Sequence, residues 1–529
     1  MAKKSIAVLD TTLRDGMQGE GISYSVRDKL SIVRALDNIG IKYIEAGNPG
    51  SNPKDMEFFN AALKLKLNNS KLCAFGSTRR KNVKISEDPG IAALTSVDVP
   101  VYVIFGKTDE LHVTQILNCS LEENLDMISD TVSYLKSLGK EVIYDAEHFF
   151  DGYARNGKYA LKTLEAAVSA GADCIVLCDT NGGRFPAEIN DITSLVVKKF
   201  GVDVGIHCHN DCGLAVADSI SAVLAGAAHV QGTFLGFGER CGNARLSTLI
   251  PNLQLKLGYS CIPENLMSEL TDTAHQIAEI TNTSVPKNTP YVGRSAFAHK
   301  AGMHADGVLK NSASFEHVSP ESVGNERRFL MSEMSGRSAI MTVINKIASG
   351  FDRNSPAIHK IIKKLKESEL AGYQYEAAEA SFELLVRKEL GLYVPYFKLI
   401  GFKTIGEQNE GVVRDASAII HVAVGDKSEM TAAAGDGPVH ALDCALRKAL
   451  EVFYPELKSV HLIDYKVRVL NHSAAAAAAV RVLITSTDGE HVWSTVGVST
   501  DIIQASWQAL VDSIEYKLIY NEKNGRIKN

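Results

Sequence analysis

Two histidines separated by a single residue are the first candidates for chemistry in this sequence. His207 and His209 lie in the stretch "GIHCHND". Side chains alternate along a β-strand, so both imidazoles would project to one face and Cys208 to the other. Neutral imidazole is a good ligand for a divalent metal ion. For an isolated His-x-His pair, two rings satisfied by ordinary hydrogen bonds are the better interpretation, so a metal site needs support from other residues.

The elements around this pair repeat one rhythm from residue 5 to about residue 235. A short apolar run is followed by a polar or glycine-containing junction and then by helical periodicity. The eight strand candidates are "SIAVLD", "YIEAG", "LCAFGST", "VYVIFG", "EVIYDAEH", "DCIVLCDT", "DVGIHCHN" and "HVQGTFLG". Eight βα units over roughly 250 residues match a (β/α)8 barrel, whereas a doubly wound sheet usually has fewer units and a glycine-rich phosphate loop. We therefore predict an α/β fold with an N-terminal TIM barrel over residues 1–275.

Polar clusters follow the predicted strands, where active sites of such barrels lie. They read "TTLRDG", "EAGNPGSN", "DAEHF", "CDTNGG", "HCHND" and "GFGERCGN". Asp15 follows the first strand and Asn243 follows the eighth, which a closed barrel places beside the first and the seventh. One Asp, two His and one Asn carbonyl would suit Mg²⁺, Mn²⁺ or Zn²⁺, with positions left open for substrate. This set raises His207 and His209 above the hydrogen-bonded alternative.

Other charged residues in these clusters are candidates for binding and proton transfer. Arg14 precedes the candidate ligand Asp15, and a guanidinium beside a divalent cation suits the stabilisation of an oxyanion or enolate. Glu147 ends a predicted strand and can act as a base, although taken singly such a residue is more often an ordinary loop or cap residue. The residues expected to contact the substrate are Arg14, Glu45, Asp145 and Thr180.

The remainder of the chain divides into two further regions. Residues 276–375 break the βα rhythm, and we expect connecting, partly helical subdomains that contribute to the active site. Residues 376–529 contain a diverged repeat of three strands and a helix, which predicts an α+β domain with a duplicated βββα unit. Duplication suits a small ligand at the junction of the copies or a dimer contact. A purely structural dimerisation domain is the alternative.

Composition restricts the class of protein and its partners. The net charge of −6 and a pI near 6.2 give no reason to expect nucleic acid or an acidic membrane as partner. The start of the chain lacks the pattern of a signal peptide, and we expect a cytoplasmic protein. Nine cysteines without paired C-x-x-C motifs indicate reduced thiols.

Several motifs make the chain resemble a known family. The stretches "LDTTLRDGMQGEG", "HCHND" and "GFGERCGNA" resemble signatures of the metal-dependent Claisen-condensing barrel family of 2-isopropylmalate, homocitrate and citramalate synthases. The resemblance continues through "AFAHKAGMHADGVLKN" into the duplicated domain, which is similar to this family's regulatory domain. Within the family, "YIEAGNPGSNPKD" and "YDAEHFFDGY" are most similar to the citramalate-forming branch.

The resemblance implies an acyltransferase that condenses acetyl-CoA with pyruvate, on a route to isoleucine. The family pattern then implies metal ligation by Asp15, His207, His209 and Asn243. It also implies that Arg14 polarises the keto oxygen and that Thr180 holds the carboxylate. The expected acid-base residues are Glu147 and His304, the latter supplied by the other subunit of a homodimer. Isoleucine is the expected effector at the C-terminal domain.

One position departs from the family pattern. Many members carry a tyrosine after "GVLKN" that is thought to assist acid-base chemistry, and the nearest equivalent in this chain is Phe315. We therefore leave Phe315 out of the predicted catalytic set.

Three other functions remain open at this point. The first is the same condensation on a bulkier 2-oxo acid, as in 2-isopropylmalate or homocitrate synthases. The second is a lyase of the 3-hydroxy-3-methylglutaryl-CoA type, which shares the barrel and the metal set but lacks a duplicated C-terminal domain. The third is a non-catalytic amino-acid sensor, which would bind a ligand without releasing CoA.

Overall fold

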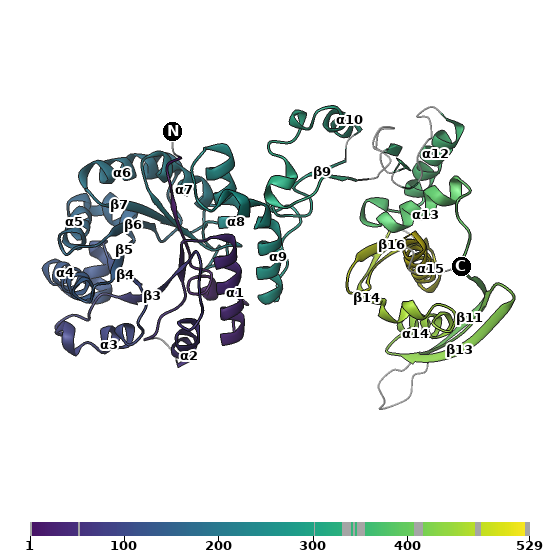
Figure 1. Cartoon of the computed structure of the whole chain (residues 1–529), viewed down its shortest axis with the longest axis horizontal. Coiled ribbons are helices and arrows are strands. Elements are labelled where there is room, and N and C mark those ends of the chain that lie inside the picture. Colours follow the sequence, from purple (N-terminus) through teal and green to yellow (C-terminus); the bar gives the residue numbers. More distant parts are fainter. Residues whose placement is uncertain are drawn as a thin grey trace. The chain divides into compact units, whose positions relative to one another are not determined.

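Eight parallel strands close into a barrel in the computed structural model of the chain (Figure 1). The structure describes residues 3–50, 53–300, 302–330, 340–341, 344–345, 347, 355–406, 416–470 and 478–523. Hydrogen bonding runs from each strand to the next along the chain, and β1 also pairs with β8 through Ala7–His229 and Asp10–Gly232. This closure confirms the predicted TIM barrel.

Each predicted strand is present. The barrel strands are β1 (Ala7–Asp10), β2 (Tyr43–Glu45), β3 (Lys71–Ser77), β4 (Val101–Lys107), β5 (Glu141–Glu147), β6 (Cys174–Asp179), β7 (Asp203–Cys208) and β8 (His229–Gly232). The surrounding helices are α1 (Val26–Ile39), α2 (Pro53–Ala62), α3 (Pro89–Thr95), α4 (Leu121–Ser137), α5 (Phe149–Ser169), α6 (Pro186–Lys199), α7 (Ala215–Leu224) and α8 (Leu246–Pro251). Most strands end before the polar residues that follow them, so these residues lie in loops.

Two apolar cores hold the barrel together. All six residues of β6 are buried, as expected for a parallel strand covered on both faces. One core lies inside the barrel and includes Leu9, Val103 and Val176. The larger core lies between the strands and the helices. Because side chains fill the barrel interior, substrate access is confined to the loop-bearing end of the strands.

Local sequence signals set the limits of α1. The Ser25 hydroxyl accepts a hydrogen bond from the backbone N–H of Asp28, and the Asp28 carboxylate accepts one from the backbone N–H of Ser25. This capping box satisfies two N–H groups that the first helical turn leaves unpaired. The helix ends at Gly40, whose φ of 89° lies in the left-handed region that glycine adopts without strain.

A buried ion pair anchors α1 to the loop after β2. The Lys29 Nζ lies 2.7 Å from Asp55 Oδ1 and donates to the Ala46 carbonyl at 3.2 Å. The backbone N–H of Asn48 donates to Asp55 Oδ2 at 3.0 Å. The pair therefore fixes the loop that immediately follows Glu45, a predicted site residue.

The chain separates into two compact units. The first comprises residues 1–297 and 317–327, and the second comprises residues 298–316 and 328–529. The first unit also contains α9 (Leu270–Ile280), and the second begins with the short pair β9 (Ala298–His299) and β10 (Arg328–Phe329) and with α10 (Gly302–Lys310). The units thus cut across the predicted connecting region, and the division at 275 and 375 stays a prediction.

The duplicated C-terminal domain is built as two βββα copies. The first copy is β11 (Lys398–Gly406), β12 (Ala416–Val424), β13 (Lys427–Gly435) and α14 (Pro438–Leu450). The second is β14 (His461–Val469), β15 (Val480–Thr487), β16 (Val492–Ser499) and α15 (Ile502–Lys523). Each copy forms its own antiparallel sheet, and both share a register shift at the same point of the first strand, at Leu399/Gly401 and Leu462/Asp464.

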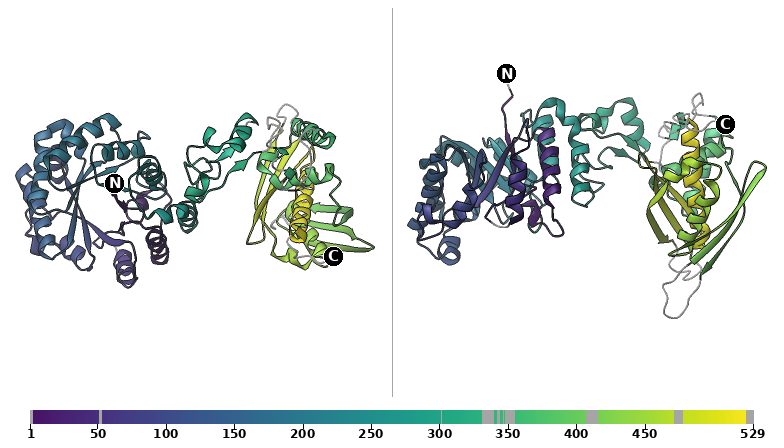
Figure 2. Two further views of the ribbon diagram at one scale, coloured as in Figure 1. Left: turned by 45° about the horizontal axis from the view of Figure 1, so that its top comes forward. Right: turned by 60° about the horizontal axis from the view of Figure 1, so that its bottom comes forward.

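The two helices of this domain lie between its two sheets (Figure 2). Residues from both helices and both sheets form one core, including Leu446, Ile484 and Leu510. Two further helices, α12 (Pro356–Leu370) and α13 (Glu379–Glu389), contribute with Val496 of β16 to a neighbouring cluster.

Among the described residues, no helix has the length and apolar character needed to cross a membrane. All nine cysteines are free, which confirms the prediction of reduced thiols. The cytoplasmic location stays a prediction.

Replacing Lys29 with Met should destabilise the barrel unit. The variant leaves Asp55 buried without its cation, and breaking a buried ion pair costs about 3–5 kcal/mol. Urea unfolding followed by circular dichroism measures this loss. Lys140→Met is the control, since its partner Asp98 is 90% exposed and a surface pair of this kind contributes at most about 1 kcal/mol. Equal unfolding curves for the two variants would contradict the anchoring role of Lys29.

Candidate active site and metal centre

A small cavity of about 190 Å³ lies at the carboxyl ends of the barrel strands. Seven of the residues predicted from the sequence line it: Arg14, Asp15, Asp145, Glu147, Thr180, His207 and His209. They come from the ends of four different strands and the loops that follow them. The fold therefore brings together residues up to 195 positions apart at one site.

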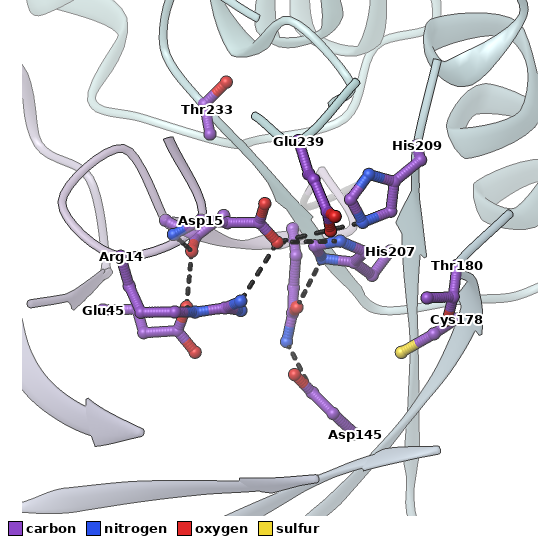
Figure 3. Close-up of polar contacts among 12 residues, drawn as sticks. Arg14, Asp15, Glu45, Asp145, Cys178, Thr180, His207, His209, Thr233 and Glu239 are labelled. Carbon is purple, nitrogen blue, oxygen red and sulfur yellow. Dashed lines mark hydrogen bonds and ion pairs between the residues drawn. The ribbon is translucent and has the colours of Figure 1, made fainter. Parts of the chain in front are cut away.

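Three of these residues form a candidate metal centre. Asp15 Oδ2 lies 3.6 Å from His207 Nε2 and 3.9 Å from His209 Nε2, and all three side chains are buried (Figure 3). One ligand atom from each lies within 4.8 Å of the others. The second carboxylate oxygen of Asp15 is buried and has no hydrogen-bond partner. A buried carboxylate with an unsatisfied oxygen facing two imidazoles fits a divalent cation.

The position of His209 differs from the prediction that both histidines lie in one strand. His207 lies in β7 and Cys208 is buried in the outer core, as the alternation predicts. β7 ends at Cys208, however, and His209 belongs to the following loop. A β-bridge to Asn243 holds His209 in place, so its direction depends on the loop after β8.

A hydrogen-bonded chain orients the ring of His207. The Nδ1 atom lies 3.0 Å from Gln231 Oε1, and Gln231 Nε2 donates to Asp145 Oδ1 at 2.9 Å. Because the glutamine oxygen only accepts hydrogen bonds, His207 carries its proton on Nδ1. The lone pair of its Nε2 atom therefore faces the candidate metal centre. Such outer contacts fix the tautomer of metal-binding histidines.

Burial sets the protonation of these groups. Burial and the neighbouring His209 lower the pKa of His207 to about 4, and burial also lowers the pKa of His209. Both rings are therefore neutral near pH 7 and able to ligate. Burial alone would raise the pKa of Asp15, but the charge of Arg14 and the neighbouring His207 and His209 together bring the pKa below its usual value. Burial raises the pKa of Asp145 well above its usual value.

Arg14 is held rigidly at the edge of the cavity. Its Nε donates to Glu45 Oε2 at 2.7 Å, and its Nη1 donates to Asp15 Oδ2 at 3.1 Å. The guanidinium carbon lies 3.8 Å from the centre of the Phe75 ring. Glu45 is fully buried, also accepts a hydrogen bond from Thr11, and does not line the cavity. Its substrate contact stays a prediction, whereas its contact with Arg14 is direct.

Asn243 is buried close to His209, and neither atom of its amide group has a hydrogen-bond partner. An amide that is buried and unpartnered is costly in a folded protein. A ligand to the amide oxygen would remove that cost, which fits the fourth position predicted for the metal ion.

Glu147 and Thr180 are held by contacts with residues at the ends of neighbouring strands. Glu147 forms an ion pair with Lys107, the last residue of β4. The next residue, His148, has a φ of 58°, a left-handed conformation unusual for a non-glycine residue. Its backbone N–H donates to Thr180 Oγ1 at 2.9 Å. That contact leaves the Thr180 hydroxyl hydrogen available to a ligand in the cavity.

His304 lies in α10 of the second compact unit. It is exposed, and its ring stacks on Phe315 with the centroids 4.2 Å apart. Phe315 is itself 45% exposed. His304 therefore has a partner within its own unit, and its predicted entry into an active site stays a prediction.

Four functional candidates were not predicted from the sequence. Gln231 lies between Val230 and Gly232 in β8, and an amide between two non-polar residues was the only sequence signal for it. Phe75 and Phe105 stack with centroids 5.2 Å apart and form an aromatic wall of the cavity. Glu239 lies in the loop after β8 and also lines the cavity.

Comparison with family models divides the chain into three matched regions. Residues 5–283 match the HMGL-like family. Residues 291–371 match the homocitrate synthase post-HMGL domain-like family, and residues 376–518 match the LeuA allosteric (dimerisation) domain.

Known proteins match the chain over almost its whole length. The (R)-citramalate synthase of Aquifex aeolicus is 53% identical over 99% of this chain and 100% of the relative. The (R)-citramalate synthase of Geobacter sulfurreducens is 51% identical over 98% of both chains. A probable 2-isopropylmalate synthase of Methanopyrus kandleri is more distant, at 32% identity over 96% of this chain and 97% of the relative.

Replacing Gln231 with Leu should weaken metal binding without unfolding the barrel. Loss of a contact that orients a histidine ligand typically costs roughly 10- to 100-fold in metal affinity. Titration calorimetry with Mn²⁺ measures the effect. Asp15→Ala and His207→Ala should abolish binding in the same assay, because each removes a ligand. An unchanged Mn²⁺ affinity in Gln231→Leu would contradict the orienting role of Gln231.

Proposed function

Because the chain belongs to the HMGL-like family and, over almost its full length, to the (R)-citramalate synthases, we propose that its barrel condenses acetyl-CoA with pyruvate. The products are (R)-citramalate and CoA, and the enzyme is an acyltransferase. The observation that carries the proposal is a fixed arginine beside a candidate metal centre in one small cavity.

The metal ligands that we propose are Asp15, His207, His209 and Asn243. The unsatisfied buried atoms of Asp15 and Asn243, together with the neutral histidines, support this set. When bound, a divalent cation supplies Lewis-acid polarisation of the oxo acid. Imidazole ligands suit Zn²⁺, whereas oxygen ligands suit Mg²⁺ and Mn²⁺, and this mixed set is open to each of them.

Arg14 and Thr180 bind the oxo acid in this proposal. The Arg14 guanidinium stabilises the negative charge that develops on the keto oxygen when the new carbon–carbon bond forms. Glu45 and the Phe75 ring hold the guanidinium in place, so little reorganisation is needed during the reaction. The Thr180 hydroxyl donates to the substrate carboxylate.

Glu147 and His304 serve the proton transfers at the methyl group of acetyl-CoA. Glu147 lines the cavity and is ion-paired with Lys107, and its carboxylate is the candidate base at the methyl group. His304 is exposed on α10 and is supplied by the partner subunit of a homodimer. The exposed apolar side chains on the outer strands of the C-terminal sheets, Ile400, Met430 and Ile463, support such a dimer.

The size of the cavity favours pyruvate over bulkier oxo acids. Its volume of about 190 Å³ is bounded by the rings of Phe75 and Phe105. A branched side chain adds apolar volume, and close-packed walls reject extra methyl groups. We therefore propose that the aromatic wall accepts the methyl group of pyruvate and disfavours 2-oxoisovalerate.

The effector that we propose is isoleucine. A pocket of about 550 Å³ lies between α14 of the first βββα copy and β14 of the second. Val439, Val460 and Leu462 give it an apolar wall, and the ion pair between Asp443 and Arg447 gives it charges of both signs. This lining suits a zwitterion with a branched apolar side chain, because each end of the ligand meets a complementary group.

Thiol release from acetyl-CoA should require pyruvate and a divalent ion. The expected result is release with pyruvate, loss on chelation, and at least 10-fold slower release with 2-oxoisovalerate or 2-oxoglutarate, since discrimination by pocket size ranges roughly from 10- to 200-fold. A colorimetric thiol assay with each oxo acid measures it. Preference for 2-oxoisovalerate or 2-oxoglutarate would assign the chain to a related synthase. No release with any of the three would favour the amino-acid sensor.

Saturating isoleucine should lower the rate of this reaction by about 5-fold or more, a typical magnitude for allosteric coupling. Asp443→Ala should lose the response and keep the basal rate, because the pocket lies in the C-terminal domain. The same samples are measured by thermal unfolding. If isoleucine leaves both the rate and the melting temperature of the unmodified enzyme unchanged, isoleucine is not the effector.

A further inference from the structure

The carboxylate of Glu239 is the least constrained acid in the cavity. Its side chain points from the loop after β8 toward the histidine pair (Figure 3), and it lines the same cavity as Arg14 and Thr180. The side chain is 57% exposed, so water reaches it. It is not part of the candidate metal group, which consists of Asp15, His207 and His209.

The other carboxylates of the cavity are already engaged. Asp15 faces both histidines and Arg14. Asp145 accepts a hydrogen bond from Gln231, and Glu147 is paired with Lys107. The single ion pair of Glu239 in the described part of the chain is to Arg240, at 3.6 Å between Oε2 and Nη1. Glu239 is therefore the cavity carboxylate with few contacts and open access to water.

The loop that carries Glu239 is held firmly. Arg240 has a φ of 58° and donates to both carboxylate oxygens of Asp211, at 2.8 and 3.0 Å. It also donates to the Thr180 carbonyl at 2.7 Å. Gly242 has a φ of 87°, and a Cβ at that position would collide with the Gly236 carbonyl. Arg240 thus ties together the loops after β6, β7 and β8, and these contacts hold the backbone next to Glu239.

We propose that Glu239 is the general base for the second half of the reaction, the hydrolysis of the citramalyl-CoA thioester. This inference rests on the proposed condensation, which leaves a thioester in the cavity. Condensation needs a base at the methyl group, and hydrolysis needs a base at water. Glu147 serves the first, and the water-exposed Glu239 serves the second.

The hydrolytic step balances with water as the only added reactant. Glu239 takes a proton from a water molecule as the water oxygen attacks the thioester carbonyl carbon and forms the new C–O bond. The C–S bond then breaks, and the CoA thiolate leaves. The proton held by Glu239 passes to the thiolate and gives free CoA. The citramalate carboxyl group ionises to solvent, and the carboxylate of Glu239 is restored.

Glu239→Gln separates the two half-reactions. The variant keeps the size of the side chain and removes its capacity to accept a proton. With Mn²⁺, pyruvate and acetyl-CoA, acetyl-CoA should be consumed, and citramalyl-CoA should accumulate in place of free CoA. Mass spectrometry identifies the thioester, and a thiol assay measures CoA. Supplied citramalyl-CoA should be hydrolysed about 100-fold more slowly or worse, the lower range for loss of a general base.

A matched control and a second variant keep this test decisive. Glu188→Gln changes an acid that is 48% exposed and paired with Arg184, outside the cavity, and it should behave like the unmodified enzyme. Glu239→Ala should repeat the result of Glu239→Gln, and both should keep the Mn²⁺ affinity of the unmodified enzyme.

Other outcomes overturn the inference. Free CoA released in step with acetyl-CoA consumption in both Glu239 variants would exclude Glu239 as the hydrolytic base. Loss of acetyl-CoA consumption or of Mn²⁺ affinity in the variants would assign Glu239 to an earlier step or to the metal site. If the unmodified enzyme consumes no acetyl-CoA with pyruvate, the proposed condensation fails, a result distinct from failure of the role of Glu239.

Discussion

Closure of the barrel between β1 and β8 is the constraint on which the candidate site depends. Asp15 follows the first strand, whereas His207 lies in the seventh strand, His209 follows it, and Asn243 follows the eighth. Without the β1–β8 hydrogen bonds these residues would lie at opposite edges of an open sheet. With them, Asp15 Oδ2 lies within 4 Å of both imidazoles. The packed interior below the site, including Leu9 and Val176, supports this geometry.

Charged side chains are concentrated at the candidate metal centre. Arg14 contacts both Asp15 and Glu45, so one cation serves two buried carboxylates. Burying several charges together is costly unless each is paired, and here the candidate metal group still leaves an oxygen of Asp15 unsatisfied. This arrangement contributes poorly to stability but suits a site that binds a cation and an anionic substrate together.

The C-terminal domain is packed differently from the barrel. Each βββα copy buries one face of its sheet against its own helix, and the two helices share a core. The outer faces keep exposed apolar residues such as Met430 and Ile463, which the fold of a single chain leaves uncovered. Duplication therefore leaves a junction between the two copies and an outer surface with exposed apolar residues.

The sequence alone determined the elements and the residue types of the site. Periodicity and chain order predicted eight βα units, the duplicated βββα domain, and the residues Arg14, Asp15, His207 and His209, since these depend on local pattern and on strand ends. Tertiary structure decided the contacts between segments far apart in the chain. Gln231 orients His207, Glu45 is buried behind Arg14, and Glu239 lines the cavity next to Arg240, which contacts Thr180. These roles depend on side-chain direction and burial, which no local pattern encodes.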